Sequence, residues 1–154
     1  MQINQDGQMI GSGEASTFHI LKQLTLLKPR ILQEFPKNGI YRQVPLKYLI
    51  SNHDFNILSP AHQKGSVDIL LVLNQNRIAV RVQGKGHGSG LKGIGKVKHD
   101  TVQALLIKKY CGLVDILLRE CPNIFKERTT PPARQEIIDS FKTQNTLIPL
   151  SQDI

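Results

Sequence analysis

The chain has 154 residues, 40% of them hydrophobic, and twenty Lys and Arg against twelve Asp and Glu give a net charge of +8. No apolar run approaches the roughly 20 residues that a bilayer crossing requires, and Cys111 and Cys121 lack the spacing of a disulfide scaffold or a zinc site. The composition therefore excludes membrane-spanning, disulfide-rich and zinc-ribbon proteins, and the length predicts one domain over 1–154.

Residues 1–6 carry neither the basic start nor the apolar stretch of a secretory signal. We therefore expect a cytoplasmic protein with no membrane association, in which both cysteines are reduced and buried. The positive charge favours a polyanionic partner, and nucleic acid is the commonest one. Between Arg77 and Lys109 there are eight basic residues and a single acidic one, Asp100, so this segment is where we expect phosphates to bind.

The first predicted element is a helix that Ser12 caps and Pro29 ends, because apolar residues recur between them at helical spacing. These residues are Phe18, Ile20, Leu21, Leu24 and Leu27. Segments 30–35 and 40–50, which are interrupted by prolines and a glycine, are predicted to be strands or irregular structure.

Two β-rich runs, 67–73 and 77–83, flank the turn-forming triplet 74–76 and predict a hairpin. Segment 84–95 holds six of the twelve glycines and is predicted to be a loop. A helix is then expected over 100–111, ended by Gly112.

The short apolar run 113–118 predicts a buried strand. Thr130 and the prolines that follow it resemble a helix start, and we expect this last helix to be a peripheral addition. The domain thus divides into a core over about 12–120 and a C-terminal helical extension over about 129–154.

The hairpin places three polar residues together. Side chains alternate along a strand, so Gln83 and Lys85 lie on the same face. If the hairpin turns about Gln75, Asp68 lies across from Val82 and one step from Gln83. All three polar groups then converge at the open end of the hairpin.

This group has the chemistry of phosphodiester hydrolysis. A carboxylate and an amide oxygen suit Mg²⁺, which also takes phosphate oxygens, so the ion is expected between Asp68 and Gln83. A lysine two residues further along can stabilise the charge that develops on the phosphate and orient the attacking water. Lys85 is the candidate for this role.

The order Ser66-Val-Asp68 followed by Gln83-Gly-Lys85 resembles the PD-(D/E)xK nuclease superfamily, with Val67 in place of the proline and Gln83 in place of the usual carboxylate. The resemblance in element order covers about 14–119. It implies an α/β fold with a restriction-endonuclease-like core, a mixed central β-sheet flanked by helices. It also implies a metal role for a glutamate on the first helix, which here is Glu14.

Within that superfamily the chain looks most like a bacterial homing endonuclease encoded in a group I intron. The resemblance implies a site-specific, metal-dependent endonuclease that acts on double-stranded DNA, with Mg²⁺ as cofactor and Mn²⁺ as a substitute. Catalytic residues would be Glu14, Asp68, Gln83 and Lys85, of which all but the lysine would bind the metal. Because one site makes one nick, a homodimer or homotetramer is expected. DNA contacts are expected from Arg77, Arg81, His87, Lys92, Lys96, Lys98 and His99.

Other interpretations stay open. Val82 to His87, followed by Asp100 and Gln103, is similar to very-short-patch-repair nucleases, and a Holliday-junction resolvase would use the same fold. The missing carboxylate at Gln83 also fits a non-catalytic DNA-binding protein. Segment 88–93 matches GxGxxG, and segment 90–96 matches a P-loop except that Val97 follows its lysine, so nucleotide binding is a further alternative.

Overall fold

The computed structural model of the chain describes residues 2–3, 9–10, 12–83, 102–117, 131–144 and 148–150. A four-stranded sheet forms its centre, and its strands stand in the order β3-β4-β5-β6. These strands are β3 (Gly39–Pro45), β4 (Ser66–Leu73), β5 (Asn76–Gln83) and β6 (Gly112–Leu117). A separate antiparallel pair is formed by β1 (Gln2–Ile3) and β2 (Met9–Ile10).

The central sheet is mixed. Its first three strands run antiparallel in chain order, whereas β6 pairs parallel to β5. A parallel neighbour requires the chain to cross back over the sheet, and the helix of residues 102–110 lies on this crossover. The expected α/β class and mixed sheet are therefore confirmed.

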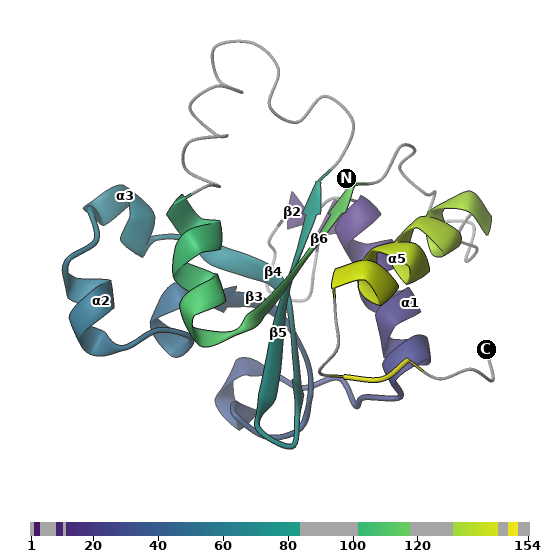
Figure 1. The fold of residues 1–154 in the computed structure, drawn as a ribbon, viewed down its shortest axis with the longest axis horizontal. Helices are drawn as coiled ribbons and strands as arrows, with labels where there is room; N and C mark the ends of the chain where they lie inside the picture. The colour runs from purple at the N-terminus through teal and green to yellow at the C-terminus, as the bar shows by residue number, and fades with distance from the viewer. Residues whose placement is uncertain are drawn as a thin grey trace, which may run out of the picture.

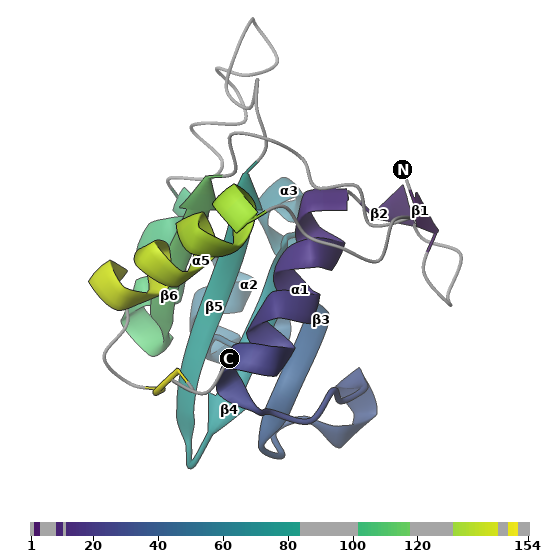
Figure 2. The same ribbon diagram turned by 90° about the vertical axis from the view of Figure 1, so that its right-hand side faces the viewer.

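Helices cover both faces of the sheet (Figures 1 and 2). On one face lie α1 (Ser12–Thr25) and α5 (Pro131–Gln144). The opposite face carries the helix of residues 102–110, together with the short helices α2 (Asn52–Asn56) and α3 (Pro60–Gln63). Two 3-10 turns, Leu32–Glu34 and Leu46–Tyr48, flank β3.

Each face of the sheet has its own apolar core. Ile69 and Leu71 of β4 pack with Ile20 and Leu21 of α1, while Leu70 and Val72 point to the other side and pack with Ile107. All of these side chains are at most 1% exposed. This part of β4 is a continuous apolar run, and because successive side chains point to opposite faces, the strand is buried on both sides.

The predicted hairpin is present, but its register differs by one residue from the expectation. Ile69 pairs with Val80 rather than with Arg81. The reason is the turn, which contains two residues instead of three: Asn74 and Gln75 both have positive φ, at 50° and 73°, as a type I′ turn requires. Asp68 lies one residue beyond the last pair of this ladder, Ile69–Val80.

The expectation that the last helix is peripheral is wrong. Ile137 and Phe141 of α5 are fully buried in the core that α1 covers, and their spacing of four residues puts them on the same face of the helix. The first helix ends at Thr25, earlier than the expected end at Pro29, and Leu26 follows with a φ of 60°.

The other expected elements after the hairpin agree with the structure where it describes them. The helix over 102–110 and strand β6 occupy the segments predicted for them, and β6 begins at Gly112. Cys111 is a free thiol and is only half-buried, whereas Cys121, Thr130 and the predicted loop lie outside the described residues. Within the described part of the chain, no helix combines the length and apolar character needed to cross a bilayer.

Candidate active site

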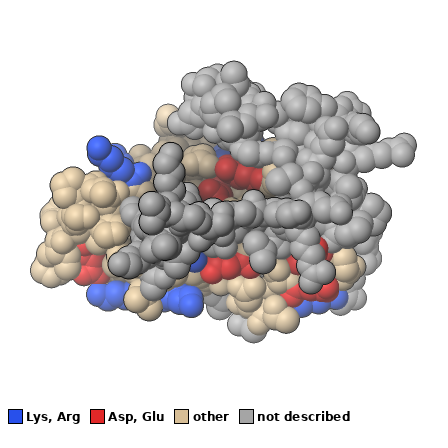
Figure 3. All heavy atoms as spheres, turned by 90° about the horizontal axis from the view of Figure 1, so that it is seen from above, with Lys and Arg blue, Asp and Glu red and all other residues tan. Residues whose placement is uncertain are grey.

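Two carboxylates from distant parts of the chain lie near each other at one end of the sheet. Glu14 lies in the first turn of α1, and Asp68 lies near the start of β4. The two are close enough for the charge of Asp68 to raise the pKa of Glu14. In a view onto this end of the molecule, acidic side chains are exposed near the middle of the face (Figure 3).

Glu14 is held in a partly desolvated position, since its side chain is only 12% exposed. Burial is the main reason why its pKa is raised above the usual 4.5, and the hydrogen bond from Gln43 opposes the rise. Gln43 Nε2 donates to Glu14 Oε1 at 2.7 Å, and Arg42 NH2 lies 3.9 Å from the same oxygen. The carboxylate is thus oriented by β3 as well as by its own helix.

Asp68 is fixed by the neighbouring strand. Pairing between β4 and β5 runs from Leu73–Asn76 to Ile69–Val80, and one step further on Asp68 Oδ2 accepts a hydrogen bond from the Val82 N–H at 2.8 Å. The Asp68 side chain therefore accepts a hydrogen bond from a backbone N–H of β5 at the end of the paired stretch. This contact brings the Asp68 carboxylate to Val82, just beyond the paired stretch of the two strands.

A chain of hydrogen bonds stands behind the contact of Gln43 with Glu14. Ser66 Oγ donates to Gln43 Oε1 at 3.2 Å, and Gln103 Nε2 donates to the Ser66 carbonyl at 3.3 Å. Our sequence reasoning missed Arg42 and Gln43. The only local signal was their position as adjacent polar residues within a mainly apolar strand, which does not identify a site.

The remaining predicted catalytic residues are placed only in part. Gln83 is the last residue of β5, and its backbone pairs with Leu117 of β6. It lies at the end of the sheet where β5 and β6 finish and α1 begins (Figure 1). Lys85 lies outside the described residues, so the expected convergence of Lys85 with Asp68 remains a prediction.

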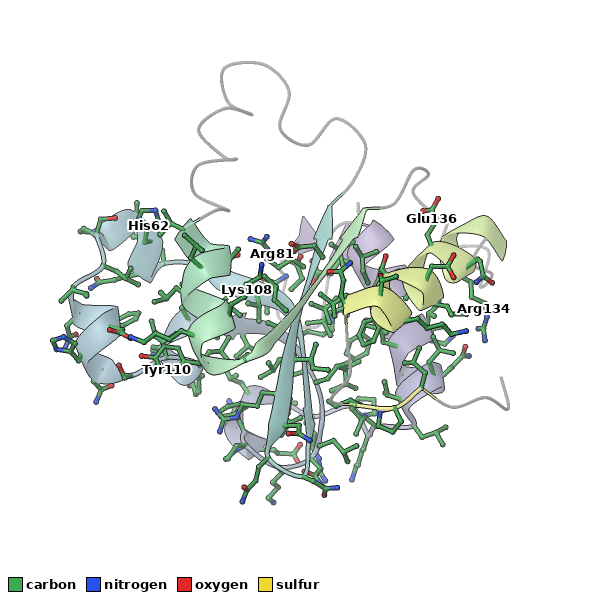
Figure 4. The ribbon with its side chains drawn as sticks, in the orientation of Figure 1. His62, Arg81, Lys108, Tyr110, Arg134 and Glu136 are labelled. Carbon is green, nitrogen blue, oxygen red and sulfur yellow. The ribbon has the colours of Figure 1, made fainter. Side chains whose placement is uncertain are left out.

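Arg81, predicted as a DNA contact, is engaged in the interior. Its Nε donates to Asp115 Oδ1 at 2.7 Å and its NH2 donates to Asp115 Oδ2 at 3.0 Å. The third guanidinium nitrogen lies 3.5 Å from Gln103 Oε1. Figure 4 shows Arg81 between the sheet and the helix of residues 102–110, and the residue is 9% exposed. A phosphate would have to break this ion pair to reach it.

Arg77 occupies the opposite end of β5. At about 3.3 Å per residue, it lies roughly 20 Å along the strand from Gln83, and its guanidinium stacks 4.9 Å above the Phe35 ring. DNA bound at the two acids would therefore have to extend along the sheet to reach Arg77. The other predicted DNA contacts lie outside the described residues; they are His87, Lys92, Lys96, Lys98 and His99.

The two acids fit the oxygen-rich ligand set that a divalent cation prefers. Two carboxylates that are close together and partly desolvated repel each other, and a cation between them would offset this repulsion. Among the described residues, no group of three His, Cys, Asp or Glu forms a ready metal site. Glu14 and Asp68 would therefore need further ligands to hold a cation, from the protein or from coordinated water.

Comparison of the chain with protein-family models, curated proteins and solved structures gave no significant match.

Proposed function

We propose that the protein is a metal-dependent endodeoxyribonuclease with its active site around Glu14 and Asp68. The observation that carries the proposal is the placement of these two acids, from α1 and β4, near one end of the sheet, where Gln43 of β3 holds Glu14 and the Val82 N–H of β5 holds Asp68. The order of a helix, three antiparallel strands, a crossover helix and a parallel strand also supports it, because the nuclease resemblance implies this order.

Mg²⁺ would be held by Glu14, Asp68 and the Gln83 amide, and when bound it supplies Lewis-acid stabilisation of the phosphate and a more acidic water. The chain's own groups position the two acids and stabilise the charge on the phosphate. The Asp68 carboxylate is held by the Val82 N–H, and Glu14 is held by Gln43. Lys85 would stabilise negative charge on the phosphate oxygens.

The charge distribution supports DNA as the substrate. Strand β5 ends at Gln83 at this end of the sheet (Figure 1), and four lysines follow it in the sequence before the helix of residues 102–110: Lys85, Lys92, Lys96 and Lys98. These lysines, with those of further copies of the chain, would bind phosphates on either side of the cut. In this proposal the protein is a homing endonuclease that acts as a dimer or tetramer.

The test is nicking of supercoiled DNA in Mg²⁺ and in EDTA. We expect Asp68→Asn and Lys85→Ala each to lower the Mg²⁺-dependent rate at least about 100-fold, since even groups that only orient metal ligands are worth 10–100-fold. Asp139→Asn is the matched control, because Asp139 is exposed on α5, and its rate should equal that of the wild type. Nicking that survives in Asp68→Asn would refute the assignment.

A second candidate function is DNA binding without cleavage. It is favoured by Gln83, whose amide lacks the charge with which a carboxylate binds a cation tightly. Retardation of DNA without nicking in Mg²⁺ or Mn²⁺ would support this candidate over the nuclease. Four-way junctions and plain duplexes should be compared in the same assay, because a junction resolvase would prefer the junction.

A further inference from the structure

Strand β3 presents two consecutive side chains to the same carboxylate, which a regular strand does not do. Neighbouring side chains in a strand point to opposite faces, yet Arg42 and Gln43 both approach Oε1 of Glu14. The burial pattern shows the same break. Tyr41 and Val44 lie in one core cluster, although they are three residues apart and alternation would put them on opposite faces.

The break coincides with an unusual backbone conformation. Gln43 has a φ of 50°, in the left-handed region that non-glycine residues seldom adopt. The partner strand shifts at the same level, because Val67 and Leu70 share the face of Tyr41 and Val44. Asp68 lies within this shifted stretch of β4. Such strain persists where the surrounding structure enforces it, and it is concentrated at functional sites.

The amide of Gln43 is fixed at both ends. Its Nε2 donates to Glu14 at 2.7 Å, and its Oε1 accepts from Ser66 Oγ at 3.2 Å. Ser66 is fixed in turn, because its carbonyl accepts from Gln103, which is 8% exposed. The donor therefore faces Glu14 and the acceptor faces Ser66.

Among the described residues, Gln43 and Arg42 both make their contacts with Oε1 of Glu14. In the proposed site, Oε2 would therefore be the oxygen that binds the cation. Arg42 NH2 is buried and has no hydrogen-bond partner among those residues, and its guanidinium lies 5.0 Å above the Phe18 ring. Arg42 thus supplies positive charge near Glu14, while Gln43 supplies the directional contact.

We propose that Gln43 is a positioning residue for a divalent-cation site, and that the break in β3 serves to direct its amide at Glu14. The inference rests on the proposed function, since it assigns the cation to Glu14 and Asp68. Gln43 itself acts through Glu14. Ser66 stands one step further back and sets the orientation of the Gln43 amide.

The experiment measures Mn²⁺ binding to the full chain without DNA, using the loss of the free-ion signal in electron paramagnetic resonance. We expect Gln43→Ala to weaken Mn²⁺ binding about tenfold, the lower end of the range for groups that orient metal ligands. Ser66→Ala should also weaken Mn²⁺ binding, but by less than Gln43→Ala. Gln23→Ala is the matched control, since Gln23 is exposed on the same helix as Glu14, and its affinity should match that of the wild type.

Thermal unfolding of each metal-free variant shows whether weaker Mn²⁺ binding results from unfolding of the protein. If Gln43→Ala is unstable, Ser66→Ala provides a test that perturbs the structure less. Wild-type affinity in folded Gln43→Ala and Ser66→Ala, together with lost binding in Asp68→Asn, would overturn the role of Gln43 and leave the nuclease proposal intact. If wild type and Asp68→Asn bind Mn²⁺ equally or not at all, the cation site itself is absent and both proposals fail.

Discussion

The ion pair between Arg81 and Asp115 is unequally buried, and this predicts an unequal response to mutation. The Arg81 side chain is 11% exposed, whereas that of Asp115 is 42% exposed. Asp115→Ala therefore removes the carboxylate that pairs with this buried guanidinium. Arg81→Met leaves instead a carboxylate that water can still reach, and the Met side chain keeps much of the apolar stem.

The magnitudes follow from this geometry. Removing one partner of a fully buried pair costs about 3–5 kcal/mol, and an exposed pair is worth roughly 0.2–1 kcal/mol. With two short hydrogen bonds and one partly exposed partner, we expect Asp115→Ala to cost about 2–3 kcal/mol, between these limits. Arg81→Met should cost about 1 kcal/mol or less, because the Asp115 carboxylate that it leaves behind is 42% exposed and water can solvate it.

Urea unfolding followed by circular dichroism measures both values. For a small domain, a loss of 2–3 kcal/mol lowers the urea midpoint by roughly 1–2 M. The contacts of Gln144 with Asp115 go to its backbone N–H and C=O, so the alanine variant keeps them. Equal losses in the two variants, or a larger loss in Arg81→Met, would refute the reasoning.

The Arg81→Met variant also tests whether Arg81 contacts DNA. If the guanidinium stays with Asp115, Arg81→Met leaves the salt dependence of DNA binding unchanged. Neutralising a lysine that does bind phosphate lowers the slope of log K against log salt by about 0.9. A comparable decrease in Arg81→Met would show that the ion pair opens on DNA.

Three further outcomes are expected. Burial raises the pKa of Glu14, so the stability that this group contributes is full below the ordinary pKa of 4.5 and is lost as pH rises through the raised pKa. In EDTA, Glu14→Gln should therefore become more stable relative to the wild type as the pH rises from 4 to 7. A difference in urea midpoints that stays constant over this range would contradict the prediction. Phe141→Ala should cost about 3–5 kcal/mol, against about 0.5 kcal/mol or less for exposed Lys142→Ala; similar midpoints for both would mean that α5 is peripheral. Gln75→Gly should raise stability by about 0.5–1 kcal/mol, because glycine tolerates the positive φ of the turn, and a lowered melting temperature would count against the type I′ turn.

Much of the fold could be predicted from local patterns. The hairpin, the helix over 102–110 and strand β6 each carry their own periodicity and end signals, which short stretches of sequence determine. The register error arose because Asn74 and Gln75 form a two-residue turn. Since neither residue is a glycine, the sequence offered no strong sign of the positive φ at both positions.

The candidate site was predictable only in part. Asp68 and Glu14 were identified from a motif and a resemblance, whereas the support from Gln43 and Arg42 depends on a break in the alternation of β3. The alternation of side chains along a strand cannot predict the position of a residue that departs from this alternation, as Gln43 does. Similarly, Arg81 looked like a surface cation until Asp115, from a strand distant in sequence, was placed beside it.

The sequence by itself determined the α/β class, the order of most elements, the basic segment and the two acids, because these depend on composition and on neighbours along the chain. Only the tertiary structure decided that α5 belongs to the core, that Arg81 is internal, and that Gln43 faces Glu14. The physical reason is that burial and side-chain partnership are set by contacts between segments, and a solvent-facing polar residue and a buried, paired one can have the same local sequence.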